Sequence, residues 1–178
     1  MNQKQISSFE ITTQIGCPVR CTKYCPQELI ISQYIGERHL TLETFKRFIS
    51  TVPMEVNIHF AGFCEPFVNQ ECTDMILWAH GQGHKVVVAS TLVGLTPDDA
   101  NRIVRIPFDR FILHLPDAYK NAHIQTTPEY LTTLGIILSN VVNISYMNMG
   151  ADFVSNNREN VARGTAEEKH RGIYHVTF

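Results

Sequence analysis

Short runs typical of β-strands alternate along this chain with longer runs that have the spacing of helices. Strands separated by helices predict parallel βαβ units, in which the helices pack outside the sheet. The expected fold class is therefore α/β, a partial (β/α)6-type, TIM-like barrel with parallel strands. The strands are expected at residues 9–15, 56–60, 85–90, 108–115 and 141–147, and residues 173–178 could add a sixth.

Helix signals lie between these strands. Thr41 and Thr96 stand where an N-cap is expected, and acidic residues follow each of them in the first turn. Thr127-Pro128-Glu129 opens a further helix in the same way. Together with the apolar spacing, these signals predict helices at 42–49, at 72–81, at 97–105 and from 127 onward.

Length and composition favour one globular domain. The chain has 178 residues, of which 44% are hydrophobic and 18% are charged, and a chain of this length buries enough surface to form a core. We therefore expect residues 1–178 to form a single domain. Residues 155–172 are polar and charged and are expected to form a surface loop. The chain stops on an apolar run, which suggests the truncated core of a longer protein.

The charge balance and the apolar runs bear on partners and location. Fifteen Lys and Arg against 17 Asp and Glu give a net charge of -2, which offers no general electrostatic argument for nucleic acid or a membrane surface as a partner. No apolar run approaches the roughly 18 residues of a membrane span, and the N-terminus lacks the apolar stretch of a signal peptide. We expect a cytoplasmic protein.

Three of the five cysteines, Cys17, Cys21 and Cys25, fall within nine residues, in the loop predicted after the first strand. Three thiolates on one loop can coordinate three irons of a [4Fe–4S] cluster and leave the fourth iron open. Two other interpretations stay open, a zinc site completed by one of the eight histidines, or three unrelated reduced cysteines.

The cysteine loop resembles that of the radical S-adenosylmethionine (radical SAM) enzymes. Within residues 16–26 the aromatic Tyr24 stands just before the third cysteine, and the βα alternation follows as it does in this family. The spacing is C-x3-C-x3-C, one residue longer between Cys21 and Cys25 than the family's usual C-x3-C-x2-C. The resemblance implies that Cys17, Cys21 and Cys25 bind a [4Fe–4S] cluster and that Tyr24 belongs to the cofactor site.

A second match follows the second predicted strand, where Ala61-Gly62-Phe63-Cys64-Glu65-Pro66 is similar to the family's Gly-Gly-Glu-Pro motif. In the family this motif holds the amino end of SAM. The resemblance implies that Gly62 permits close approach of the backbone and that Glu65 faces the ammonium group of the ligand. Cys64 stands in the usual place of a glycine.

Weaker matches lie further along the chain. Residues 90–94 resemble the family's Thr-Asn-Gly stretch after the third strand, and residues 111–117 resemble the end of its fourth strand. On that alignment His114 takes the position that often reaches the ribose of SAM, the alternative being a core histidine with satisfied hydrogen bonds. Thr91 could face a substrate or cap a turn.

The resemblance implies an enzyme that cleaves SAM reductively. An electron from reduced flavodoxin or ferredoxin would break the sulfonium bond, and the 5′-deoxyadenosyl radical would abstract hydrogen from a substrate, which could be a peptide, a sugar or a small metabolite. Both motifs fall in loops at the carboxyl ends of strands, where they would face one cavity. The alternative is a non-catalytic module that keeps the fold and binds zinc or an iron–sulfur cluster.

Overall fold

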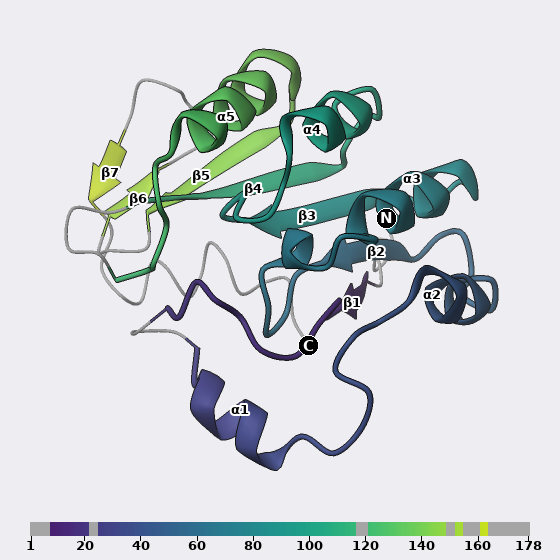
Figure 1. Cartoon of the computed structure of the whole chain (residues 1–178). Helices are drawn as coiled ribbons and strands as arrows, with labels where there is room; N and C mark the ends of the chain where they lie inside the picture. The colour runs from purple at the N-terminus through teal and green to yellow at the C-terminus, as the bar shows by residue number, and fades with distance from the viewer. Residues whose placement is uncertain (1–7, 22–24, 117–120, 149–151, 155–160, 164–178) are drawn as a thin grey trace.

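One sheet of mainly parallel strands forms the centre of the molecule. The structure is a computed structural model that describes residues 8–21, 25–116, 121–148, 152–154 and 161–163. Its sheet has the order β1-β2-β3-β4-β5-β6-β7, so strands that follow one another in sequence are neighbours in space (Figure 1). The first five strands are parallel, which confirms the prediction. They are β1 (Ser8–Ile11), β2 (Asn57–Phe60), β3 (Val86–Ser90), β4 (Arg110–Leu115) and β5 (Ile144–Asn148).

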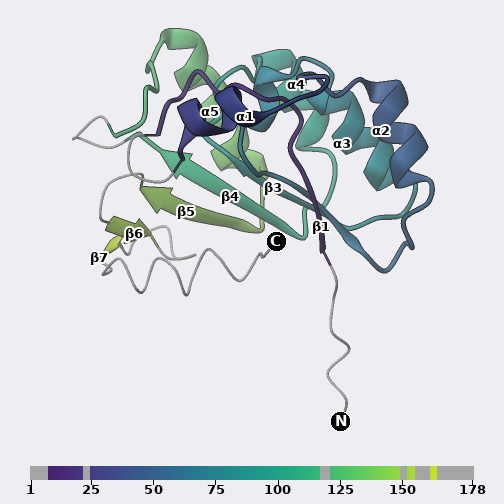
Figure 2. The same cartoon turned by 90° about the horizontal axis from the view of Figure 1, so that it is seen from below.

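A row of helices covers one face of this sheet (Figure 2). The helix α1 (Gln27–Gln33), which has no counterpart among the predicted helices, stands apart from the row (Figure 1). No helix in the described part of the chain is long and apolar enough to cross a membrane. The row consists of α2 (Leu42–Ile49), α3 (Cys72–Gly81), α4 (Pro97–Ile103) and α5 (Pro128–Asn140), and a short 3-10 helix, η1 (Pro66–Val68), precedes α3.

Threonine side chains begin three of these helices. Thr41, Thr96 and Thr127 each accept a hydrogen bond from the backbone N–H three residues later, at 3.1 to 3.2 Å. This contact satisfies one of the N–H groups that the start of a helix leaves unpaired. The capping signals in the sequence therefore mark where α2, α4 and α5 begin.

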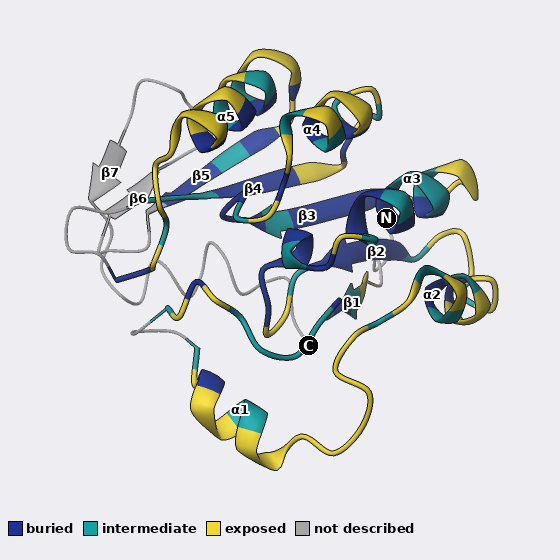
Figure 3. Cartoon of the chain, viewed as in Figure 1, coloured by how far each residue is buried: buried dark blue, intermediate teal, exposed yellow. Residues whose placement is uncertain are grey.

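The core lies between the sheet and the row of helices. Ile58, Phe60 and Phe111 of the central strands are fully buried, and they belong to one continuous apolar cluster with Phe45 of α2 and Ile137 of α5. Figure 3 shows the central strands as largely buried and the outer sides of the helices as exposed. Burial of apolar surface on this face holds the two layers together.

The first strand is shorter than predicted. Of the run 9–15, only the part up to Ile11 belongs to β1. Beyond it the chain turns towards the segment before α2, where Leu40 N–H donates a hydrogen bond to Thr13 O at 3.0 Å. An alternating run rich in β-branched residues indicates an extended chain, but it does not specify the segment with which that chain pairs.

Two short antiparallel strands, β6 (Asp152–Val154) and β7 (Val161–Arg163), extend the edge of the sheet beyond β5. β7 lies within residues 155–172, so the prediction of a loop is wrong there. Antiparallel pairing uses backbone groups and a short connection, so such a strand forms without an apolar stripe in the sequence. The strand suggested at 173–178 lies outside the described residues. Within the described residues the sheet is open, with β1 and β7 at its edges.

The loop between β3 and α4 is tightly constrained. Leu92 has φ +65°, a left-handed conformation that bulky residues rarely adopt. Gly94 has φ +90°, and a Cβ atom on it would lie 2.5 Å from the carbonyl oxygen of Phe67 in η1. The two backbones therefore touch at a position where only glycine fits.

We expect Gly94→Ala to destabilise the fold by about 2 kcal/mol or more, because the added methyl group meets backbone atoms and φ stays left-handed. Urea unfolding would measure the change in the free energy of unfolding. Gly135→Ala is the matched control, since Gly135 lies in α5 with no atom within 4 Å of an added Cβ. This control should be neutral or more stable by up to about 1 kcal/mol. Equal losses in the two variants would contradict the close contact at Gly94.

Candidate metal and cofactor site

Three loops meet at the carboxyl ends of β1, β2 and β3. They are the described part of the cysteine loop after β1, the loop 61–66 after β2, and the loop that follows Ser90 of β3. Glu65 N–H donates a hydrogen bond to Cys17 Sγ at 3.3 Å, and Glu65 Oε2 accepts hydrogen bonds from Thr91 at 2.6 Å. The two sequence motifs, which were predicted to face one cavity, are in direct contact.

Gln27, the first residue of α1, ties both ends of the cysteine loop to the loop after β2. Its Oε1 accepts a hydrogen bond from Cys17 N–H at 3.1 Å. Its Nε2 donates to Cys25 Sγ at 2.9 Å and to the carbonyl oxygen of Phe63. No local sequence pattern points to this buried glutamine, because its partners lie in two separate loops. One amide therefore positions the cysteine loop against the second motif.

The thiols around this contact influence one another. Interaction with the neighbouring Cys64 thiol, together with the hydrogen bond from Glu65 N–H, lowers the pKa of Cys17. Burial, and then the charges of Cys17 and Cys25, raise the pKa of Cys21 to about 12. Burial also raises the pKa of Cys25. The contacts of Cys17 thus favour its thiolate, whereas burial and like charge oppose the ionisation of Cys21 and Cys25.

The donor chemistry of the cysteine loop fits a soft metal centre. A bound cation would favour the thiolates of Cys21 and Cys25 against the burial and the like charge that raise their pKa values. Among the residues that the structure describes, no three His, Cys, Asp or Glu side chains are gathered closely enough to hold a metal ion. Cluster binding by Cys17, Cys21 and Cys25 therefore stays a prediction. Tyr24, the aromatic residue expected at the cofactor site, lies outside the described residues.

The carboxylate of Glu65 is only 5% exposed and is bonded to the chain after β3. Oε1 accepts hydrogen bonds from Ser90 Oγ at 2.6 Å and from Phe67 N–H at 3.4 Å. Oε2 accepts from both the N–H and the hydroxyl of Thr91, each at 2.6 Å. Burial raises the pKa of Glu65 to about 7, against the lowering effect of these hydrogen bonds. The carboxylate thus joins β2 to β3, and its contact with the ammonium group of SAM stays a prediction.

Gly62 is required by the packing at the end of β1. It has φ +85°, and a Cβ atom would overlap Thr12 Oγ1 and lie 3.3 Å from Glu10 Oε1. Thr12 Oγ1 also accepts a hydrogen bond from Phe63 N–H at 3.3 Å. The close backbone approach that the motif predicts for Gly62 therefore exists here towards the chain's own first strand.

Two histidines lie on the face of the sheet opposite the helices. Ile58 and Leu113, which precede His59 and His114 in the sequence, belong to the core under the helices. Because successive side chains of a strand point to opposite faces, both histidines point away from that core. Glu10 of β1 pairs in register with His59 of β2, and 3.8 Å separates Glu10 Oε2 from His59 Nδ1.

These histidines are neutral and unsatisfied at neutral pH. Neither ring nitrogen of His59 has a hydrogen-bond partner among the described residues, and the same holds for Nε2 of His114. Burial lowers the pKa of each imidazole to about 4, with a further contribution from Arg110 at His59 and from His59 at His114. Each neutral ring carries one donor and one acceptor nitrogen. Contact between His114 and the ribose of SAM stays a prediction.

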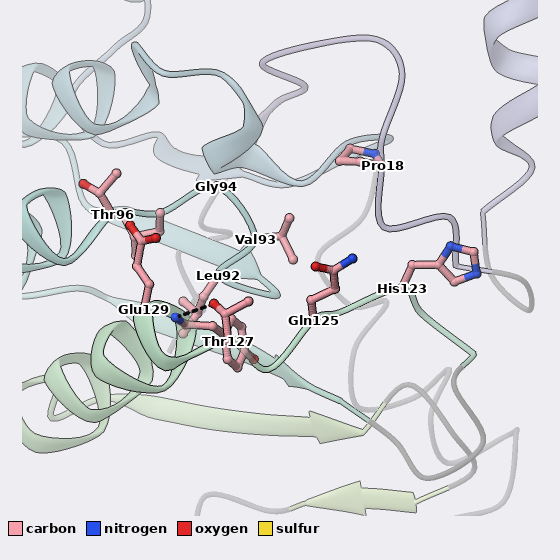
Figure 4. A pocket seen from close by; sticks show the side chains of 11 residues that line it. Pro18, Leu92, Val93, Gly94, Thr96, His123, Gln125, Thr127 and Glu129 are labelled. Atoms are coloured by element: carbon pink, nitrogen blue, oxygen red, sulfur yellow. Dashed lines mark hydrogen bonds between the residues drawn. The ribbon is translucent and has the colours of Figure 1, made fainter.

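A cavity of about 430 Å³ opens beside two of these loops, the cysteine loop and the loop after β3 (Figure 4). Pro18 of the cysteine loop, Val93 after β3 and Gln125 before α5 line it. Tyr130 of α5 also lines it and is 7% exposed, and in the described part of the chain its hydroxyl has no hydrogen-bond partner. Burial, and then the charge of Glu65, raise the pKa of Tyr130 to about 12, so the hydroxyl keeps its proton. The cavity has the size of a small-ligand site.

Comparison with solved structures shows the fold. The crystal structure of BtrN in complex with AdoMet and 2-DOIA is similar, with a TM-score of 0.57 over 82% of this chain and 14% sequence identity. The structure of selenomethionine BtrN in an open conformation gives a TM-score of 0.52 over 84% of this chain and 13% identity. This chain covers 57% and 59% of the length of those two structures. No protein-family model matches the chain, and no curated protein sequence matches it. The likeness shows that this chain has the fold of the matching part of BtrN.

We expect Glu65→Gln to lower the free energy of unfolding by about 2–4 kcal/mol, although the side chain keeps its shape. The new amide group would place a donor against the donors of Ser90 or Thr91. Glu71→Gln is the control, because the side chain of Glu71 is 40% exposed and accepts a backbone hydrogen bond from Leu42 at 2.8 Å. Its loss should stay below about 1.5 kcal/mol. Urea unfolding that gave equal losses would show that the buried carboxylate does not hold the loops.

Acid should destabilise the fold through His59. The pKa of this imidazole is about 4 in the folded chain, against an ordinary value of 6.5. Between these values the unfolded chain binds more protons, so the free energy of unfolding falls by about 3 kcal/mol as the pH drops from 7 to 4. Urea unfolding at several pH values would measure the total loss, and His59→Gln should remove the share of His59 while that of His114, whose pKa is also about 4, remains. A variant as acid-sensitive as the parent would show that the fold does not keep His59 neutral.

Proposed function

We propose that this chain is a radical SAM enzyme in which Cys17, Cys21 and Cys25 hold a [4Fe–4S] cluster. The observation that carries the proposal is the hydrogen bond from Glu65 N–H to Cys17 Sγ, which joins the two motifs at one place. The fold, which is like that of a protein crystallised with AdoMet, supports it. The bound cluster would supply the electron that cleaves SAM into methionine and a 5′-deoxyadenosyl radical, which abstracts hydrogen from the substrate.

The chain's own residues would position the reactants. Gln27 would hold Cys17 and Cys25 in place through one amide. Glu65 and Gly62 would fix the loop that receives the amino end of SAM, because each is locked against a neighbouring strand. Such preorganisation is the protein's main contribution when a cofactor carries the chemistry.

The substrate would lie over the sheet face that carries His59 and His114. Two neutral imidazoles, with ring nitrogens that have no hydrogen-bond partner in the described part of the chain, suit a molecule with several hydroxyl or amide groups, such as a sugar, a peptide or another small polar metabolite. Hydrogen abstraction by a radical needs no proton acceptor, so these side chains would orient the substrate. We place the reaction in the cytoplasm, with reduced flavodoxin or ferredoxin as the electron donor.

A non-catalytic metal module is the second candidate. Both oxygens of Glu65 already accept hydrogen bonds from the chain itself, which leaves the carboxylate engaged within the protein. Such a module would bind zinc or an iron–sulfur cluster through the same cysteines, and it would neither bind nor cleave SAM.

Anaerobic reconstitution with iron and sulfide tests the proposal. We expect about four irons per chain and an electron paramagnetic resonance signal of the reduced protein that changes when SAM is added. Reduced protein with SAM should release 5′-deoxyadenosine and methionine. Cys17→Ala, Cys21→Ala and Cys25→Ala should each lose the cluster. Cys72→Ala should keep it, because Cys72 is fully buried in the apolar core.

Two results would decide against catalysis. A cluster whose signal is indifferent to SAM would favour the non-catalytic module. A parent protein that assembles no cluster, or three loop variants that all keep it, would refute the assignment of Cys17, Cys21 and Cys25 as ligands.

A further inference from the structure

The cavity beside the cysteine loop has walls that the fold holds in place. Thr133 Oγ1 of α5 donates a hydrogen bond to Leu95 O at 3.3 Å, which joins α5 to the loop after β3. His123 N–H donates to Val19 O at 2.6 Å, which joins the segment before α5 to the cysteine loop. The cavity is therefore preformed, and a preformed site loses little free energy to ordering when a ligand binds.

The buried residues that line the cavity lie on the helix side of the sheet. They are Leu92, Leu95 and Tyr130, and all three belong to the core between the sheet and the helices. His59 and His114 point to the opposite face. A molecule in this cavity would thus lie on the other side of the sheet from a substrate placed over the two histidines.

The hydroxyl of Tyr130 is a buried polar group that can serve such a molecule. Tyr130 is only 7% exposed, and its hydroxyl has no hydrogen-bond partner among the described residues. Burial, and then the charge of Glu65, raise the pKa of Tyr130 to about 12, so the hydroxyl is a donor at neutral pH. An unpaired buried hydroxyl is costly, and the cavity is where a hydrogen-bond acceptor can reach it.

The rest of the lining defines the chemistry of the ligand (Figure 4). Pro18 and Val93 provide apolar surface, whereas the exposed side chains of Gln125 and Glu129 provide oxygen atoms that accept hydrogen bonds. None of the described lining residues is Lys or Arg, so an anionic ligand would meet the charge of Glu129 without compensation. An amide offers both a carbonyl acceptor for Tyr130 and N–H donors for these oxygens.

We propose that this cavity is a second ligand site, which binds a small uncharged molecule that carries an amide group on an apolar ring. The carbonyl oxygen of the amide accepts a hydrogen bond from the hydroxyl of Tyr130. The ring lies against Pro18 and Val93, and the N–H groups point towards Gln125 and Glu129.

Nicotinamide and benzamide are the probes, and nicotinate and benzoate are their anionic counterparts of the same shape. We expect the amides to bind the full chain with a Kd of about 1 mM or tighter, and the acids at least about 10-fold more weakly. Proton–nitrogen correlation NMR would measure both, with the largest shifts at Val93, Gln125 and Tyr130. Acids that bind as well as the amides, amides that do not bind, or shifts confined to His59 and His114 would overturn the proposal.

Tyr130→Phe removes only the hydroxyl. We expect it to weaken nicotinamide binding about 5-fold, as the loss of one hydrogen bond between uncharged groups does. The free energy of unfolding of the free chain should be unchanged or higher, because the hydroxyl has no partner in the described part of the chain. Tyr146→Phe is the control, since Tyr146 is buried in β5 and does not line the cavity. Unchanged affinity in Tyr130→Phe, or a free chain that this variant destabilises, would overturn the proposal.

These measurements need no cluster, so their outcome is separate from that of the proposed function. A chain that assembles no cluster but binds nicotinamide through Tyr130 would refute the radical SAM function and support the second site. In the reconstituted protein, the resonance response to SAM should be the same with and without saturating nicotinamide. Competition between the two would place SAM in this cavity and would overturn the assignment of a second site.

Discussion

A carboxylate shut away from solvent must find its hydrogen-bond donors inside the protein, and Glu65 imposes this requirement on the carboxyl end of the sheet. Most of its donors lie at the end of β3 and just after it, and its own N–H reaches Cys17 after β1. Ser90, one of those donors, also accepts a hydrogen bond from Leu92 N–H at 2.8 Å, so the same network holds the left-handed turn. The three loops therefore cannot shift independently, and the arrangement of the candidate site follows from one buried charge.

The sheet divides the molecule into an apolar side and a polar side. Under the helices the strands contribute apolar residues to a continuous core, whereas the opposite face carries Glu10, His59 and His114. Buried polar groups without partners are costly, and a fold retains them where something else supplies the missing hydrogen bonds. The face that packs against the helices and the face available for a ligand are thus the two sides of the same strands. Residues on the ligand face can therefore change without disturbing the apolar core.

The sequence pattern predicted what depends on local chemistry. The five parallel strands, the capped starts of α2, α4 and α5 and the meeting of the two motifs all follow from spacing, capping residues and the alternation of elements. What it missed depends on contacts between distant segments. Gln27 acts through partners in two loops. Glu65 accepts hydrogen bonds from residues 25 and 26 positions further along the chain. The first strand ends early because its continuation pairs with the segment before α2. β7 was missed because a short edge strand needs only backbone pairing.

Two closely packed glycines, Gly62 and Gly94, set a strict requirement on the loops after β2 and β3. At Gly62 the backbone meets the side chain of Thr12, and at Gly94 it meets the backbone of η1, so a side chain at either place would displace the segment packed against it. A loop can absorb an inserted residue between its cysteines. These two positions have no such tolerance. The fold therefore requires a glycine two residues past the second strand and another four residues past the third, whatever the cysteines bind.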